Sequence, residues 1–271
     1  MNIPSPYQRL HILAGDKGIA ALKDSRVIVF GVGGVGSWCA EALVRSGIYD
    51  CTLVDSDLIC ATNINRQVQA LPATVGKVKV TELAERLSAV NPDAVITPLQ
   101  KTFDRSTSET FDLSVFDYII DAIDSLSSKV ELMIRATDSG ATLYSALGAS
   151  GKLNPRNIKI SSIWETQKCR LGRFVRKRLR RRGFSGDFTC VYSDEEPIQQ
   201  YNTTPNSENE EHFSLLEDEE ESENGLVNEG SGSKKQINGS VVHMAGSFGF
   251  ILAGLVVEDI INKANETAGK P

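Results

Sequence analysis

The sequence predicts an α/β protein: a Rossmann-like, mostly parallel sheet with helices on both faces, extended by an antiparallel segment and a C-terminal helix. Two observations carry this prediction. The apolar, β-branched run Arg26–Phe30 (RVIVF) leads directly into the glycine-rich stretch GVGGVG at residues 31–36. Strand-like runs then alternate with helical periodicities from residue 26 to about residue 150, which is typical of parallel sheets covered by helices.

The elements follow from local signals. Apolar runs that are too short for helices predict strands, and apolar residues repeated at helical spacing predict helices. Asp55 closes the second strand, and Pro92 ends the helix that begins after Gly76. The expected strands are 26–30, 51–54, 94–97, 118–120, 142–146 and an alternating, antiparallel 158–164; the expected helices are 37–46, about 79–90 and 129–138.

Composition divides the chain further. Residues 168–182 hold nine basic residues and no acidic one, whereas nine acids lie between Glu208 and Glu223. A segment so acidic and poor in apolar residues is expected to be a disordered loop. The predicted organisation is an N-terminal segment with an ATP-binding core (1–160), a basic substrate-side extension (161–205), the acidic loop (206–236) and a C-terminal helix packing on the core (237–271).

Bulk composition narrows the class of protein. The chain has 271 residues, 41% hydrophobic and 24% charged, and a net charge of −6, so the molecule as a whole is not a basic nucleic-acid binder. Its five cysteines form no CxxC pair, which argues against a structural zinc site and favours a reducing, cytoplasmic compartment. Residues 241–261 are nearly long enough to span a bilayer; a buried helix, with a dimer interface as one setting, is favoured, and membrane contact is left open.

The glycine-rich stretch predicts a nucleotide site. Its four glycines fit GxGxxG between a strand and a helix, where backbone N–H groups and the helix dipole favour phosphates. Asp55, at the end of the next strand, is placed to bind a ribose hydroxyl. The motif alone does not separate NAD from ATP. The glycines are Gly31, Gly33, Gly34 and Gly36.

A set of polar residues beyond Asp55 favours ATP. Arg, Lys, Asn and Asp side chains converge on the carboxyl edge of the predicted sheet, where a dehydrogenase has no task for them. AMP transfer needs cations around the α-phosphate and the leaving pyrophosphate, and a carboxylate to hold Mg²⁺. The candidate nucleotide-binding residues are Asp57, Asn63, Arg66, Gln67, Lys79 and Asp121, and Asp124 is the candidate metal ligand.

These motifs together resemble the ThiF/MoeB/HesA family, relatives of ubiquitin-activating enzymes. The matching pieces are GVGGVGS, LVDSD, TNINRQ, VGKVK and IIDAIDS, in that order. The resemblance implies an ATP-binding fold, a homodimer and carboxylate adenylation. It implies that Asp55 holds the ribose, that Asn63, Arg66 and Lys79 contact phosphates, and that Asp124 coordinates Mg²⁺. Arg9 aligns with an arginine lent across the dimer, so the implied catalytic set is Arg9, Arg66, Lys79 and Asp124.

Within the family, the sequence looks most like the branch that acts on threonylcarbamoyladenosine in tRNA. The pieces DAIDS, RKRLRRRG and CVYSDEEP carry this likeness. It implies adenylation of the threonine carboxylate beside the anticodon, followed by attack of the carbamoyl group of the modification. The basic segment agrees with an RNA substrate and predicts salt-dependent binding; a helix paired with the protein's own acidic loop is the alternative.

Other functions stay open at this level. One is activation of a ubiquitin-like sulfur-carrier protein; another is an NAD(P)-dependent oxidoreductase or a nucleotide-binding module without catalysis. Cys190 is the best candidate for a covalent step, although a structural role is favoured because no basic partner adjoins it. The sequence does not decide which tRNAs are substrates, or whether a cysteine desulfurase or a monovalent cation takes part.

Overall fold

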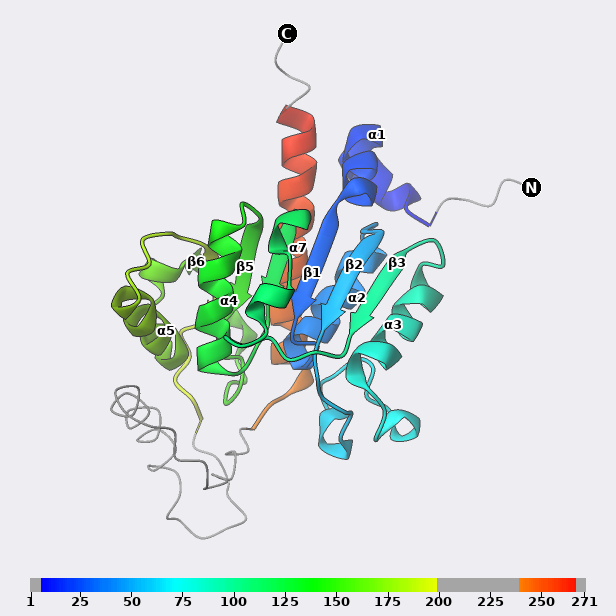
Figure 1. Ribbon diagram of the computed structural model, residues 1–271. Coiled ribbons are helices and arrows are strands. Elements are labelled where there is room, and N and C mark those ends of the chain that lie inside the picture. Colours follow the sequence, from blue (N-terminus) through cyan, green and yellow to red (C-terminus); the bar gives the residue numbers. More distant parts are fainter. Residues whose placement is uncertain (1–5, 199–238, 267–271) are drawn as a thin grey trace, which may run out of the picture.

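The structure is a computed structural model that describes residues 6–198 and 239–266. The acidic loop expected at 206–236 lies outside these residues. Seven strands form one sheet in the order β3-β2-β1-β4-β5-β7-β6, and only β6 runs antiparallel, against β7. This arrangement confirms the predicted fold class (Figure 1). The strands are β1 Arg26–Phe30, β2 Asp50–Val54, β3 Val95–Leu99, β4 Tyr118–Asp121, β5 Thr142–Ala146, β6 Ile158–Ser162 and β7 Thr189–Ser193.

Helices cover both faces of the sheet. Alternate residues of β1 point to opposite faces: Val27 and Val29 join one buried cluster, and Ile28 and Phe30 join another. The first cluster packs under α2, α3 and α7, with Leu22 of α1, and the second packs under α4 and α5. The helices are α1 Gln8–Asp24, α2 Gly34–Arg45, α3 Lys79–Val90, α4 Leu126–Asp138, α5 Arg170–Arg181 and α7 Val242–Glu266.

Helix α7 lies alongside α2. A Cβ atom at Gly249 would come within 2.5 Å of the Val35 carbonyl oxygen and 2.8 Å of the Cys39 nitrogen, so glycine permits this close approach. By length and composition α7 could cross a membrane, but half of its apolar window is buried inside the protein. Burial of Phe248, Leu252 and Val256 makes α7 part of the core.

Several element boundaries differ from the prediction, and three of them have a clear local cause or a shift of a whole turn. Helix α2 begins at Gly34 rather than at residue 37, because the last glycines of the motif form its first turn. Helix α4 begins at Leu126 rather than at residue 129. Strand β6 stops at Ser162 instead of running to residue 164, because the Ser162 hydroxyl accepts from Trp164 N and starts a 3-10 turn.

Candidate functional site

The glycine turn lies where β1 ends, between β1 and β4. Gly31 has φ +83°, and a Cβ atom there would lie 2.6 Å from the Ala122 carbonyl oxygen, so the turn packs directly on the loop after β4. A Cβ atom at Gly36 would collide with the Gly31 carbonyl oxygen. The two glycines let β1, the turn and α2 meet closely. The N-terminus of α2 then faces the carboxyl edge of the sheet, the place where doubly wound folds have their ligand crevice.

Asp55 joins this turn to the end of β2. Its Oδ2 accepts from Val32 N at 2.9 Å, and its Oδ1 accepts from Asp57 N at 2.9 Å. Burial raises the pKa of Asp55, while nearby Lys79 and the two backbone N–H groups oppose that rise. The carboxylate is therefore held by backbone groups at the end of β2, beside the glycine turn.

Lys79 begins α3 and points back towards the end of β2. Its Nζ lies 2.7 Å from Asp57 Oδ2, and its backbone N–H donates to the Asp57 carbonyl oxygen at 3.1 Å. The Lys79 side chain is 8% exposed, whereas that of Asp57 is 64% exposed. The ammonium is thus fixed at the rim of the crevice by an acid that faces solvent.

Asn63, Arg66 and Gln67 come from the turn between Asp57 and α3. The Asn63 side chain accepts from Cys60 N, and its carbonyl accepts from the N–H groups of Arg66 and Gln67, so Asn63 shapes the turn. The Arg66 guanidinium donates to the Thr62 carbonyl at 2.8 Å, and its stem lies beside Gly34. Gln67 is 5% exposed, with its amide nitrogen near Gly33.

The two acids after β4 have different surroundings. Asp121 is fully buried; its Oδ2 accepts from Lys129 Nζ and Ser145 Oγ, both at 2.7 Å, and its Oδ1 accepts from Ile123 N. Asp121 therefore braces the strand ends and has no surface to offer a nucleotide. Asp124 is exposed and has no partner among the described residues.

The next feature is the arrangement of side chains that could bind a metal ion. Within residues 6–198 and 239–266, no cluster of three or more His, Cys, Asp or Glu side chains could hold a metal ion. A single carboxylate such as Asp124 still suits Mg²⁺ when nucleotide phosphates supply the other ligands.

Cys190 is fully buried, and burial raises its pKa, so its thiolate is disfavoured.

Arg9 does not reach this crevice in its own chain. It is exposed in the first turn of α1, and α1 lies at the end of the sheet where the strands begin, opposite the glycine turn (Figure 1). Beside it, Ile12 and Leu13 are 78% and 81% exposed.

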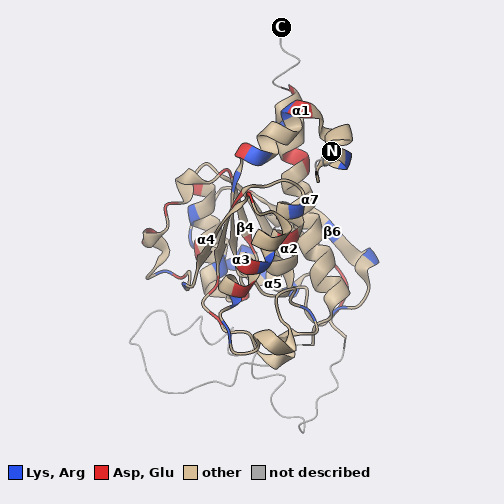
Figure 2. Cartoon of the chain, turned by 90° about the vertical axis from the view of Figure 1, so that its right-hand side faces the viewer, with Lys and Arg blue, Asp and Glu red and all other residues tan. Residues whose placement is uncertain are grey.

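The basic segment forms α5, with seven basic residues and no acidic one among its twelve. Helix α3, by contrast, carries charges of both signs (Figure 2). Some of the segment's cations are structural. Arg176 donates to the Thr166 carbonyl, Arg180 stacks over Trp164, and Arg182 bonds Glu131 at 2.7 Å. Burial alone would raise the pKa of Glu131, but hydrogen bonds from Arg135 and Arg182 lower it, which ties α5 to α4.

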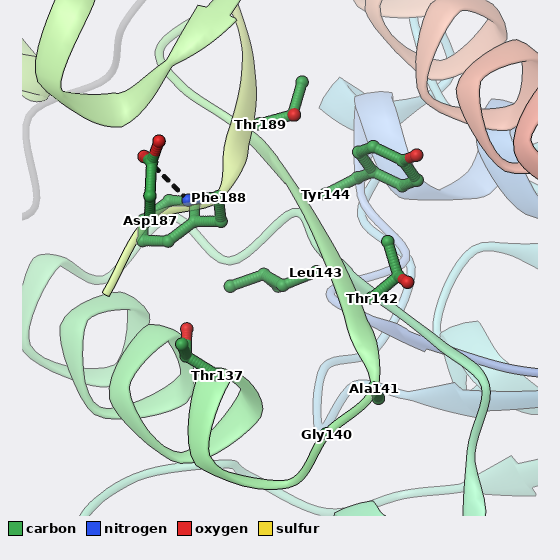
Figure 3. Close-up of a pocket in the computed structure, with 9 residues that line it drawn as sticks. All are labelled: Thr137, Gly140, Ala141, Thr142, Leu143, Tyr144, Asp187, Phe188 and Thr189. Atoms are coloured by element: carbon green, nitrogen blue, oxygen red, sulfur yellow. Dashed lines mark hydrogen bonds between the residues drawn. The ribbon is translucent and has the colours of Figure 1, made fainter.

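A cavity of about 260 Å³ lies elsewhere, at the start of β5, between α4 and β7 (Figure 3). Its walls include Thr137, Tyr144 and Thr189, and Asp187 turns back to accept from Phe188 N. Because it adjoins the amino end of β5, it is separate from the glycine turn.

Two side chains at the site were not predicted. Lys129 is fully buried against Asp121, and Gln69 is 3% exposed beneath the glycine turn. The sequence contains a weak signal for Lys129, since it is a lone cation on the apolar face of α4. It contains none for Gln69, whose role depends on its neighbours in the folded protein.

Comparison with known proteins identifies relatives of this chain and agrees with its fold. A tRNA threonylcarbamoyladenosine dehydratase of Bacillus subtilis is 38% identical over 192 residues, which cover 71% of this chain and 76% of that protein. One from Escherichia coli is 36% identical over 168 residues, 62% of this chain and 63% of that protein. The crystal structure of the Escherichia coli enzyme TcdA in complex with ATP matches with a TM-score of 0.78 at 27% identity, covering 96% of each chain.

The match to a whole family is wider than either of the two sequence alignments. The description of the ThiF family fits residues 7–267, which include the glycine turn, the Arg66 turn, the end of β4, the basic helix and α7. Sheet order, crevice and sequence thus point the same way, and the chain belongs to the ThiF family.

Proposed function

We propose that this protein is an ATP-dependent dehydratase of threonylcarbamoyladenosine in tRNA. The observation that carries the proposal is the set of charged groups carried by the segments around the glycine turn. The Arg66 stem lies beside Gly34, Lys79 lies near Asp55, and Asp124 is exposed just after the β4 loop that packs on Gly31. This set suits transfer of AMP to a carboxylate, because cations and a metal-binding acid surround the place where phosphate charge develops. The proposed substrate is that of the relatives from Bacillus subtilis and Escherichia coli, which are tRNA threonylcarbamoyladenosine dehydratases.

The reaction proceeds in two steps. The threonine carboxylate of the modified adenosine attacks the α-phosphorus of ATP, the bond to the β-phosphate oxygen breaks, and pyrophosphate leaves. The carbamoyl group of the same modification then attacks the activated carbonyl carbon and loses a proton. AMP leaves with the former carboxylate oxygen, and the ring closes. One water is lost from the substrate as ATP becomes AMP and pyrophosphate, and no enzyme nucleophile is needed.

Each side chain has a task in this scheme. Asp55 binds the ribose, and the N-terminus of α2 receives phosphate. Lys79 and Arg66 neutralise the charge that grows on the α-phosphate and the leaving group. Asn63 holds the turn that carries Arg66. Asp124 would hold Mg²⁺, which when bound neutralises the phosphates. Asp121 acts through position alone, since its oxygens are already used.

Helix α5 is the proposed contact with tRNA. Its cations offer several phosphate contacts without sequence specificity, as expected of a backbone-binding element. The Glu131–Arg182 bond fixes the end of the helix against the core, so α5 is held in a defined position.

The protein is also proposed to act as a homodimer. The exposed apolar side chains of Ile12 and Leu13 beside Arg9 suit burial against a second copy, which would bring Arg9 to a site that its own chain does not reach.

Pyrophosphate release measures the proposal directly. The enzyme is incubated with ATP and Mg²⁺ together with modified tRNA, the same tRNA without threonylcarbamoyladenosine, or a ubiquitin-like sulfur-carrier protein. Release with the modified tRNA alone, with the cyclic nucleoside found by mass spectrometry, is the expected result. Release with the carrier protein alone would assign the site to carrier activation, and release with none of them would remove the proposal.

A further inference from the structure

Val32, inside the glycine turn, is held by hydrogen bonds from two sides. Val32 N donates to Asp55 Oδ2 at 2.9 Å, and the Val32 carbonyl accepts from Gln69 Nε2 at 2.8 Å. A carbonyl only accepts, so the amide nitrogen of Gln69 must face Val32. Two side chains from different elements therefore fix one residue of the turn.

Holding the Val32 carbonyl also orients the next N–H group. In a trans peptide the C=O and the following N–H point in opposite directions, and the chain has no cis peptide among its described residues. With the Val32 carbonyl turned inward to Gln69, the Gly33 N–H is turned outward. No described residue accepts from the Gly33 N–H, which lies at the start of α2, where N–H groups attract phosphate.

Gln69 is built into its place. Its backbone carbonyl accepts from Thr74 Oγ1 at 2.8 Å, and the preceding Val68 N donates to Ser37 Oγ. The side chain is 3% exposed, and its Oε1 has no partner in the described part of the chain. Burying an amide with one atom unsatisfied is unfavourable, and a leucine would fill the same space without that cost. What leucine lacks is the N–H donor.

We propose that Gln69 is a positioning residue for the nucleotide: it fixes the Val32–Gly33 peptide so that the Gly33 N–H meets a phosphate of ATP. This inference rests on the proposed use of ATP. Gln69 would act only by orienting one backbone N–H that donates to phosphate. It should therefore affect the affinity for ATP and not the affinity for adenosine.

Calorimetric titration of ATP and of adenosine into the full chain tests this. Gln69→Leu removes the donor and keeps the volume. We expect its Kd for ATP to rise about tenfold, the effect of removing one hydrogen bond to a charged group, and its Kd for adenosine to stay within about twofold of wild type. In turnover, KM for ATP rises more than kcat falls.

Asn91→Leu is the matched control, because it removes another buried amide, with an unpartnered Nδ2, at the end of α3 and away from the turn. It should leave both Kd values unchanged. If Gln69→Leu does not fold, Gln69→Glu keeps the shape but, when ionised, cannot donate to Val32, and it should show the same selective loss of ATP.

Two results would overturn the inference: a folded Gln69 variant that binds ATP as wild type does, or one that loses ATP and adenosine equally. A wild-type protein that binds no ATP would instead refute the proposed function, so the two failures are distinguishable.

Discussion

Lys79 is the cation whose surroundings tie it most tightly to the crevice, since its ammonium is almost buried and paired with exposed Asp57. Lys79→Ala should reduce kcat/KM by about 10²–10³-fold, the usual effect of removing one donor to transition-state charge. Stability should change little, because the pair has one solvent-exposed partner. Steady-state pyrophosphate release and thermal melting measure both effects.

Lys77 is the control for Lys79. It lies two residues earlier, pairs with Glu82 at 3.0 Å and is 54% exposed. Lys77→Ala should keep kcat/KM within about twofold of wild type, because a surface pair contributes little. Equal losses of kcat/KM in the two variants would show that Lys79 acts only through the net positive charge of this region and not through a specific contact.

Asp124 is the acid expected to meet Mg²⁺, because it is exposed and without a partner in the described part of the chain. Asp124→Asn should raise the Mg²⁺ concentration needed for half-maximal activity by about tenfold, since the amide is a weaker ligand for a hard cation. Circular dichroism should be unchanged. Asp138→Asn, at the far end of α4, is the control, and the same Mg²⁺ curve for Asp124→Asn and wild type would contradict the assignment.

The residues of the site were predicted unevenly. Asp121 and Asp124 were both placed at the end of β4, yet their roles differ because Lys129 and Ser145 enclose one and not the other. Local sequence tells which side chains reach the sheet edge. It does not tell which are enclosed, since enclosure depends on partners from other elements.

Helix α7 depends on a glycine where it packs against α2. Gly249→Ala would push a methyl group against the Val35 carbonyl and should destabilise the protein by about 1–3 kcal/mol. Gly254, five residues on, has nothing within 4 Å of an added Cβ. Gly254→Ala should instead stabilise the helix by up to about 1 kcal/mol. Urea unfolding of both variants measures the change in the free energy of unfolding. Equal changes would contradict a close contact between α7 and α2 at Gly249.

The basic segment was recognised from its charge alone. In the structure it forms helix α5, which also has an apolar face, with Phe174, Val175 and Leu179 buried. We predict that Arg178→Gln combined with Arg181→Gln lowers the slope of log Kd against log salt for tRNA by about 1–2, one for each phosphate that is no longer neutralised. Filter binding at several salt concentrations measures it.

The control for α5 removes the same charge from other elements. Lys17→Gln combined with Arg105→Gln changes exposed residues of α1 and of the loop before β4. If this pair lowers the slope as much as the α5 pair, binding follows net charge and α5 does not bind the tRNA.

At the scale of the whole molecule, the parallel sheet and its crevice could be predicted because each βα unit has its own local signals. A C-terminal helix that packs on the core was also the favoured prediction for residues 241–261. Its neighbour α2 could not be predicted, because the glycine that lets α7 approach α2 looks, in the sequence, like any other glycine.

Binding of nucleotide should stabilise the whole fold, because the crevice joins β1, β2, β4 and α3. At an ATP concentration about 100 times Kd, with Mg²⁺, Tm should rise by roughly 5–10 °C through mass action. NAD at the same concentration should leave Tm unchanged, since the Lys79 and Arg66 side chains serve a triphosphate. Lys79→Ala should show a smaller rise with ATP. A rise with NAD equal to that with ATP would mean that the crevice is a dinucleotide site and that the adenylation assignment is wrong.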